Sequence, residues 1–287
     1  MFKGWFANRK GRGGITDVVG ALGLEYRWEK PAGPEDPRWL TAGVRGSRSL
    51  QFQVSDDTFR LVVVIAGAGN PAALDAVAQA LNRDAFSFRT VVLRDDGDLS
   101  LRVQFYSTAF DASACTRAIE TFTSEVNTLG PLLQPLAPGP VRIPLFDNHS
   151  ACPREPVDWA QIAMLLAGID GETEQRPMGL RWSSSTGVHE VLVIPNDRGA
   201  VEDLVLVSGR GAGRPTTSVS DRNAFLNSLN VAGPSACAID LSRGVLLHRT
   251  YLPVGAAVDA AAFVRTARHH HGFWSTPRYQ DALRVLG

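Results

Sequence analysis

The sequence lacks the charge excess that marks several large classes of protein. Its 287 residues include 29 Lys and Arg against 29 Asp and Glu, so the formal net charge is zero. Nucleic-acid-binding proteins usually have a basic excess, and disordered acidic proteins have an acidic one. We therefore expect a globular protein that binds no nucleic acid, and the length suits about two domains. Of the 29 basic residues, 26 are Arg, which we attribute to composition bias.

Long apolar runs and cysteines are scarce as well. The longest apolar run, residues 61–66, is far shorter than the roughly 20 residues of a membrane-spanning helix. The N-terminus has no apolar region of the kind found in signal peptides. Cys115, Cys152 and Cys237 are widely spaced, which argues against a disulfide framework. These absences predict a cytoplasmic protein.

Catalytic and metal-binding signatures are also missing. The sequence has no Gly-x-Ser-x-Gly and no His-Glu-x-x-His motif. Cys237 falls in a predicted strand and suits a small core residue better than a nucleophile. Asp95, Asp96 and Asp98 are too few for a calcium loop and fit a solvated hairpin turn. We expect a protein that is not an enzyme and that holds no cofactor or metal.

Proline divides the chain into two parts. A stretch between Leu129 and Pro156 holds seven prolines, which block helix and favour an extended linker. The sequence therefore predicts a flexible N-terminal segment (1–13), a first domain (14–136), a linker (137–156) and a second domain (157–287).

Each domain shows the same predicted order of elements, α-β-β-β-α-β-β-α. In the first, we expect helices over 15–24, 72–82 and 111–129, and strands over 39–44, 49–54, 59–66, 86–93 and 99–106. In the second, we expect helices over 157–169 and 221–230, one from 259 and a short one from 277, and strands over 178–184, 188–194, 203–207, 236–241 and 245–252. This order indicates an α+β fold, with an antiparallel sheet flanked by helices in each domain.

Landmark residues recur at nearly constant spacing in the two halves. Gly97 follows Asn82 by 15 residues, and Gly244 follows Asn230 by 14. Asp111 and Asp259 then follow these glycines by 14 and 15 residues. We infer the duplication of one domain.

The second half carries a recognisable pattern of motifs. Residues 225–230 read Phe-Leu-Asn-Ser-Leu-Asn, a turn follows at 240–244, and the strand at 245–253 ends in Leu-Pro. From about Val157 to Leu286 it resembles the YbjN family of bacterial proteins, whose domain is similar to that of type III secretion chaperones. The resemblance is fainter over Thr16 to Leu136, where Asn82 is kept but Gln79 replaces the first Asn. It implies the same sheet-and-helix fold and a role in binding other proteins, and it implies no catalytic residues.

The paired asparagines have two interpretations. Asn227, Asn230 and their first-half counterpart Asn82 could bind a ligand or the backbone of a peptide. Alternatively they end a helix, where Asn tolerates a left-handed conformation and its amide satisfies free carbonyls. We favour the helix end, because it explains the position before a strand in both halves.

The segment from Gly209 to Arg214 is a candidate anion- or ligand-binding loop. It contains Gly211 and Gly213 and would offer the guanidinium groups of Arg210 and Arg214. It lacks the third glycine of a dinucleotide fingerprint and the Lys-Ser/Thr of a phosphate loop. A flexible surface loop is the simpler interpretation.

Two further clusters have plain interpretations. His269, His270 and His271 are consecutive, so on a helix they point about 100° apart and do not converge on a metal. We expect a cation cluster at a helix C-terminus. In residues 1–12, aromatic and basic side chains are mixed, which predicts either weak contact with an anionic membrane or a frayed terminus.

These observations favour a non-enzymatic bacterial protein that binds a protein or peptide partner. An antiparallel sheet covered on one side leaves an apolar face or groove for such a partner. The two copies would dock as an intramolecular pseudo-dimer, so the chain is predicted to be a monomer. The alternative is a small-molecule or nucleotide sensor that uses the loop from Gly209 to Arg214.

Overall fold

The computed structural model describes most of the chain in fifteen stretches. They are residues 14–31, 33, 39–43, 49–54, 58–66, 70–84, 89–94, 97–106, 111–133, 156–195, 201–211, 217–231, 233–254, 257–277 and 279–281. The candidate membrane contact at 1–12, the linker up to residue 155, Asp95, Asp96, Gly213 and Arg214 lie outside the described residues.

The first half is a six-stranded antiparallel sheet, sheet A, with helices on one face. Its elements are α1 (Ile15–Ala21), β1 (Glu25–Trp28), β2 (Trp39–Gly43), β3 (Leu50–Val54), β4 (Thr58–Ala66), α2 (Pro71–Asn82), β5 (Thr90–Leu93), β6 (Leu99–Tyr106) and α3 (Ala112–Leu133). The strand order is β1-β2-β3-β4-β6-β5.

The second half repeats this arrangement around sheet B. Its elements are α4 (Trp159–Ala167), β7 (Glu172–Arg176), β8 (Gly179–Ser184), β9 (Gly187–Pro195), β10 (Val201–Gly211), α5 (Val219–Val231), β11 (Ser235–Asp240), β12 (Val245–Pro253) and α6 (Ala260–Phe273). Read from its β7 end, sheet B has the strand order of sheet A, β7-β8-β9-β10-β12-β11. The α+β fold in two similar halves is confirmed.

The structure corrects the predicted elements in three places. Each half has one strand more than the sequence predicts, β1 and β7. Both are edge strands with largely exposed side chains, so they lack the alternation of apolar residues that identifies a half-buried strand. Strand β10 continues to Gly211 instead of ending at residue 207. Helix α3 continues through Pro131 to Leu133, because a proline near a helix end removes only one main-chain hydrogen bond.

Local signals in the sequence explain where the main elements begin and turn. The side chains of Asp111 and Asp259 each accept hydrogen bonds from the two main-chain amides that open α3 and α6. Gly97 and Gly244 have φ values of 86° and 61°, in the left-handed region that glycine enters without strain. The landmarks of the sequence repeat therefore have matching structural roles.

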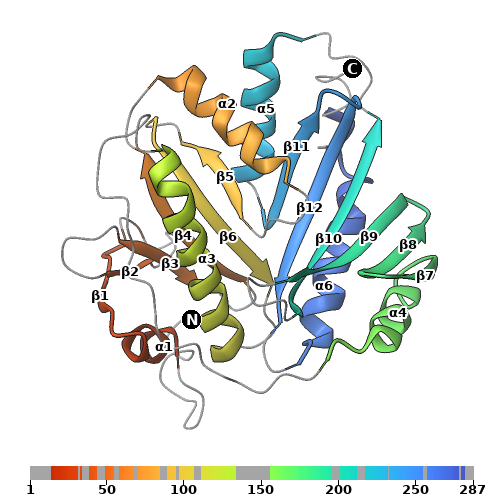
Figure 1. Cartoon of the computed structure of the whole chain (residues 1–287), viewed down its shortest axis with the longest axis horizontal. Coiled ribbons are helices and arrows are strands. Elements are labelled where there is room, and N and C mark those ends of the chain that lie inside the picture. Colours follow the sequence, from red (N-terminus) through yellow and green to blue (C-terminus); the bar gives the residue numbers. More distant parts are fainter. Residues whose placement is uncertain are drawn as a thin grey trace.

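The two halves pack around a pseudo-two-fold axis, and their contacts are reciprocal. Helix α2 packs on β11 and α5 on β5, while α3 contacts β12 and α6 contacts β6. Figure 1 shows α2 and α5 together at the top, α3 in front of sheet A and α6 behind sheet B. Such exchange of equivalent contacts is the pattern of an isologous dimer, here within one chain.

The described helices include none that is both long and apolar enough to cross a membrane.

Candidate functional site: an arginine-lined hollow beside the junction of the two halves

The motif asparagines bind strand backbone. The side chain of Asn82 accepts from the amide of Val91 and donates to its carbonyl, both at 2.8 Å. Asn230 makes the same pair with Cys237, at 2.6 and 3.0 Å. The preferred interpretation was wrong about the partner. These amides satisfy the next strand instead of the carbonyls of their own helix, and no described non-glycine residue has positive φ.

Asn227 binds peptide backbone as well, but across the junction. Its side chain accepts from the amide of Leu93 at 2.9 Å and donates to the Leu93 carbonyl at 2.6 Å. Leu93 ends β5, an edge strand of sheet A, so Asn227 of α5 covers main-chain groups that would otherwise be open. At the equivalent position of α2, Gln79 is buried and its Oε1 has no partner. The pseudo-symmetry is therefore incomplete at this point.

Two arginines join the halves reciprocally. Because Val91 and Cys237 are equivalent, strand pairing makes Arg102 of β6 equivalent to Arg249 of β12. Arg102 donates to the carbonyls of Val231 and Gly233, at 2.8 and 2.9 Å.

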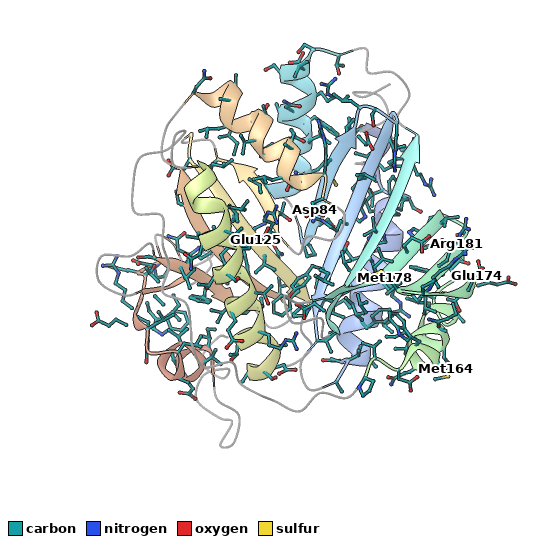
Figure 2. The ribbon with its side chains drawn as sticks, viewed as in Figure 1. Asp84, Glu125, Met164, Glu174, Met178 and Arg181 are labelled. Carbon is teal, nitrogen blue, oxygen red and sulfur yellow. The ribbon has the colours of Figure 1, made fainter. Side chains whose placement is uncertain are left out.

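Arg249 reaches across in the opposite direction, to the carbonyls of Asp84 and Arg89, which are not the exact equivalents of Val231 and Gly233. Asp84 lies between the two halves (Figure 2). Burial is the main cause that lowers the pKa of Arg102 and of Arg249 to about 9.

A buried ion pair also joins the two halves. Arg117 of α3 lies 3.4 Å from Asp203 of β10. Asp203 also accepts from the hydroxyl of Tyr251 and the amide of Val254, at 2.8 and 3.0 Å. Tyr251 belongs to β12 but packs into the core of the first half, with its ring against Phe105. Burial raises the pKa of Asp203, and the charge of Arg117 opposes this shift.

A hollow lies on the outer face of sheet A, the face that is turned away from α3. The hollow has a volume of about 400 Å³ and reaches from the end of β1 to β5 and the end of α5. It is lined by Glu29, Trp39, Gln51, Arg60, Val62, Val92, Arg94, Ser100, Arg102 and Val231. Alternation along β3, β4 and β6 sends Gln51, Arg60 and Arg102 to this face and the apolar residues between them to the core.

Positive charge dominates the hollow, since three guanidinium groups face one carboxylate. Glu29 is bonded to Arg27 at 3.0 Å, and the nearby Thr41 and Arg27 side chains lower its pKa. The Nε of Arg60 donates to Gln104 at 2.9 Å, and burial lowers the pKa of Arg60. In the described part of the chain, the two terminal NH₂ groups of Arg60 have no hydrogen-bond partner.

The equivalent surface of sheet B carries different residues. Strand pairing makes Arg60 equivalent to Val205 and Gln104 equivalent to Tyr251. Val205 and Tyr251 are 0% and 3% exposed. The same position of the repeat is therefore a fully covered valine in one half and a half-exposed arginine in the other.

The predicted anion loop is not described as a whole. Gly209, Arg210 and Gly211 belong to β10, and the rest of the segment up to Arg214 lies outside the described residues. The guanidinium carbon of Arg210 lies 5.0 Å from the ring centre of Trp274 and 5.5 Å from that of Tyr279. Arg210 is thus engaged with two aromatic rings.

The histidine prediction is wrong for the middle of the three. His270 is 0% exposed, and burial together with nearby histidines holds its pKa well below the ordinary value. It bonds to Ser208 and Thr250 and does not act as a surface cation. His269 lies 3.1 Å from the hydroxyl of Tyr106 across the junction, and His271 lies 3.2 Å from Asp170. Among the described residues, no group of three or more His, Cys, Asp or Glu is arranged to hold a metal.

In the second half, three buried histidines occupy positions where the first half has apolar core residues. By strand pairing and helix position, His189, His248 and His270 correspond to residues of the first half that are all 0% exposed, namely Leu50, Leu101 and Phe122. The imidazole of His248 stacks on Phe273 with ring centres 4.0 Å apart, and neither ring nitrogen has a partner.

Sequence reasoning missed Arg60, Arg102, Arg249, His189 and His248. The arginines were attributed to composition, although two of them occupy equivalent positions of the repeat. Aligning the two halves by their turn glycines, Gly97 and Gly244, would have shown Arg102 opposite Arg249 and Leu101 opposite His248. In comparisons with known proteins, no family model and no curated protein matches this chain.

Proposed function

We propose that this chain is a non-enzymatic cytoplasmic protein that binds a segment of another polypeptide on the outer face of sheet A. One observation carries the proposal. Arg60 stands in a hollow where its terminal NH₂ groups have no hydrogen-bond partner among the described residues, at a position where the other half has a buried valine. Membership of the YbjN family is part of this proposal.

The fixed arrangement of the two halves supports a binding role. Asn227, Arg102 and Arg249 each bond to main-chain atoms across the junction, so the walls of the hollow are held in place before any ligand arrives. Preorganisation of this kind lowers the entropic cost of binding. The groove expected from the sequence was apolar, whereas the hollow combines apolar walls with arginine.

A peptide array tests the proposal. The labelled full-length protein is applied to immobilised peptides of varied sequence, together with two variants. Arg60→Val introduces the side chain that the other half uses. Arg243→Ala removes a charge from the β11–β12 turn, where the side chain is 80% exposed, and serves as the control.

The wild type and the control should retain a common set of peptides that Arg60→Val loses. Retention of the same peptides by all three proteins, or of none by the wild type, would contradict the proposal.

A further inference from the structure

We infer that the hollow binds a carboxylate carried on an apolar body, with Arg60 as the anchoring residue. This inference rests on the proposed function and specifies the chemistry of its ligand. The carboxylate can belong to an acidic peptide side chain or to a free organic acid, and the experiment below separates the two sources.

The free donors of Arg60 suit a carboxylate. Its Nε is bonded to Gln104, which fixes the plane of the guanidinium group. The two terminal NH₂ groups remain available. A guanidinium offers parallel N–H donors in a fork that matches the two oxygens of a carboxylate.

A second arginine stands behind the first and cannot turn away. Arg102 is 5% exposed, and its terminal nitrogens are held by the carbonyls of Val231 and Gly233. Its Nε is buried without a partner. Repulsion from Arg60 contributes to the lowered pKa of Arg102. An anion bound at Arg60 would relieve this repulsion, because opposite charges at short range stabilise each other.

The one carboxylate in the lining does not already supply that anion. Glu29 is bonded to Arg27, which is not among the residues that line the hollow. The described lining therefore keeps a net positive charge. The charge balance favours an anionic ligand over a neutral one.

The remaining walls favour an apolar body on the ligand. Trp39, Val62, Val92 and Val231 supply apolar surface, and about 400 Å³ is within the range of small-ligand sites. The hydroxyl of Ser100 donates to the carbonyl of Val92 and is not free for a third ligand oxygen.

The test is calorimetric titration of the full-length protein with matched probes. They are the capped peptide acetyl-Val-Leu-Glu-amide, the same peptide with Gln in place of Glu, succinate, and inorganic phosphate. Each probe is titrated into the wild type, Arg60→Val and Arg243→Ala. Thermal unfolding checks that the variants are folded.

The Glu peptide should bind the wild type and Arg243→Ala equally, and at least about tenfold more weakly to Arg60→Val. On the wild type, the Gln peptide should bind more weakly than the Glu peptide by a similar factor. Equal binding of the Glu and Gln peptides, unchanged binding by Arg60→Val, or phosphate binding tighter than either carboxylate overturns the inference but leaves peptide binding in place. If succinate binds through Arg60 and no peptide does, the inference holds and the proposed function fails. If no probe binds, both fail.

Discussion

Acidification should destabilise the protein through three buried histidines of the second half. His189 is 1% exposed, and His248 and His270 are 0% exposed. Burial, followed by nearby charged groups, lowers the pKa of His189 to about 4. It holds the pKa values of His248 and His270 well below the ordinary value. In the unfolded chain, all three should titrate near pH 6.5, as free histidines do.

The direction of the effect follows from proton uptake. A folded-state pKa below the unfolded-state value means that the unfolded chain binds more protons at pH values between the two. The stability contributed by the three neutral imidazoles is therefore fully present above about pH 6.5 and is lost as the pH falls below it, for His189 down to its folded-state pKa of about 4. At about pH 5.5, each imidazole that stays neutral lowers the free energy of unfolding by a little over about 1 kcal/mol. The three together lower it by about 4 kcal/mol. That is a large part of the roughly 5–15 kcal/mol that stabilises a typical domain.

Urea unfolding, followed by tryptophan fluorescence at about pH 7.5 and about pH 5.5, measures this loss. The informative variant is His248→Leu, because Leu101 fills the equivalent buried position of the first half. Between the two pH values, the free energy of unfolding of this variant should fall by about 1 kcal/mol less than that of the wild type. Val193→Ala, a buried change in the same half, should lower stability without altering the pH difference.

Other groups near the three imidazoles also respond to pH. His269, His271, Arg210 and Asp170 all contribute to their electrostatic surroundings. The comparison of His248→Leu with the wild type isolates one imidazole from these groups. An identical pH difference in the two proteins would refute the reasoning, because it would mean that His248 does not remain neutral in the folded state.

Three further predictions concern the junction and the assembly. Asn227→Ala should cost about 1–2 kcal/mol of unfolding free energy, since it leaves the amide and carbonyl of Leu93 without their partner. A urea titration checks this value, and no loss would contradict it. Asp203→Asn should cost about 3 kcal/mol, because it breaks the buried ion pair with Arg117. An unchanged midpoint in thermal unfolding would contradict that loss. Light scattering should show a monomer, because the two equivalent halves are already paired within one chain. A stable dimer would contradict this expectation.

The repeat and its elements were largely predictable because their signals are local. Helix caps, turn glycines and alternating strands depend on residues a few positions apart, and the structure places Asp111, Gly97 and β6 where the sequence predicts them. The edge strands β1 and β7 escaped prediction because exposed edges carry little apolar alternation. The site was not predictable in the same way, because Arg60 is bonded to a residue 44 positions away in the chain.

The sequence by itself determined that one α+β unit occurs twice, and it marked Asn82 and Asn230 as a shared feature and Asn227 as a motif residue of the second half. Only the tertiary structure decided what these residues do. Asn227 and Arg102 bond to partners 134 and 129 residues away, and such contacts exist only once the halves have packed. The same packing leaves one arginine half-buried in a hollow and its counterpart valine fully covered. The physical reason is that duplication fixes which residues are equivalent, whereas packing fixes which equivalent surfaces face water and which face protein.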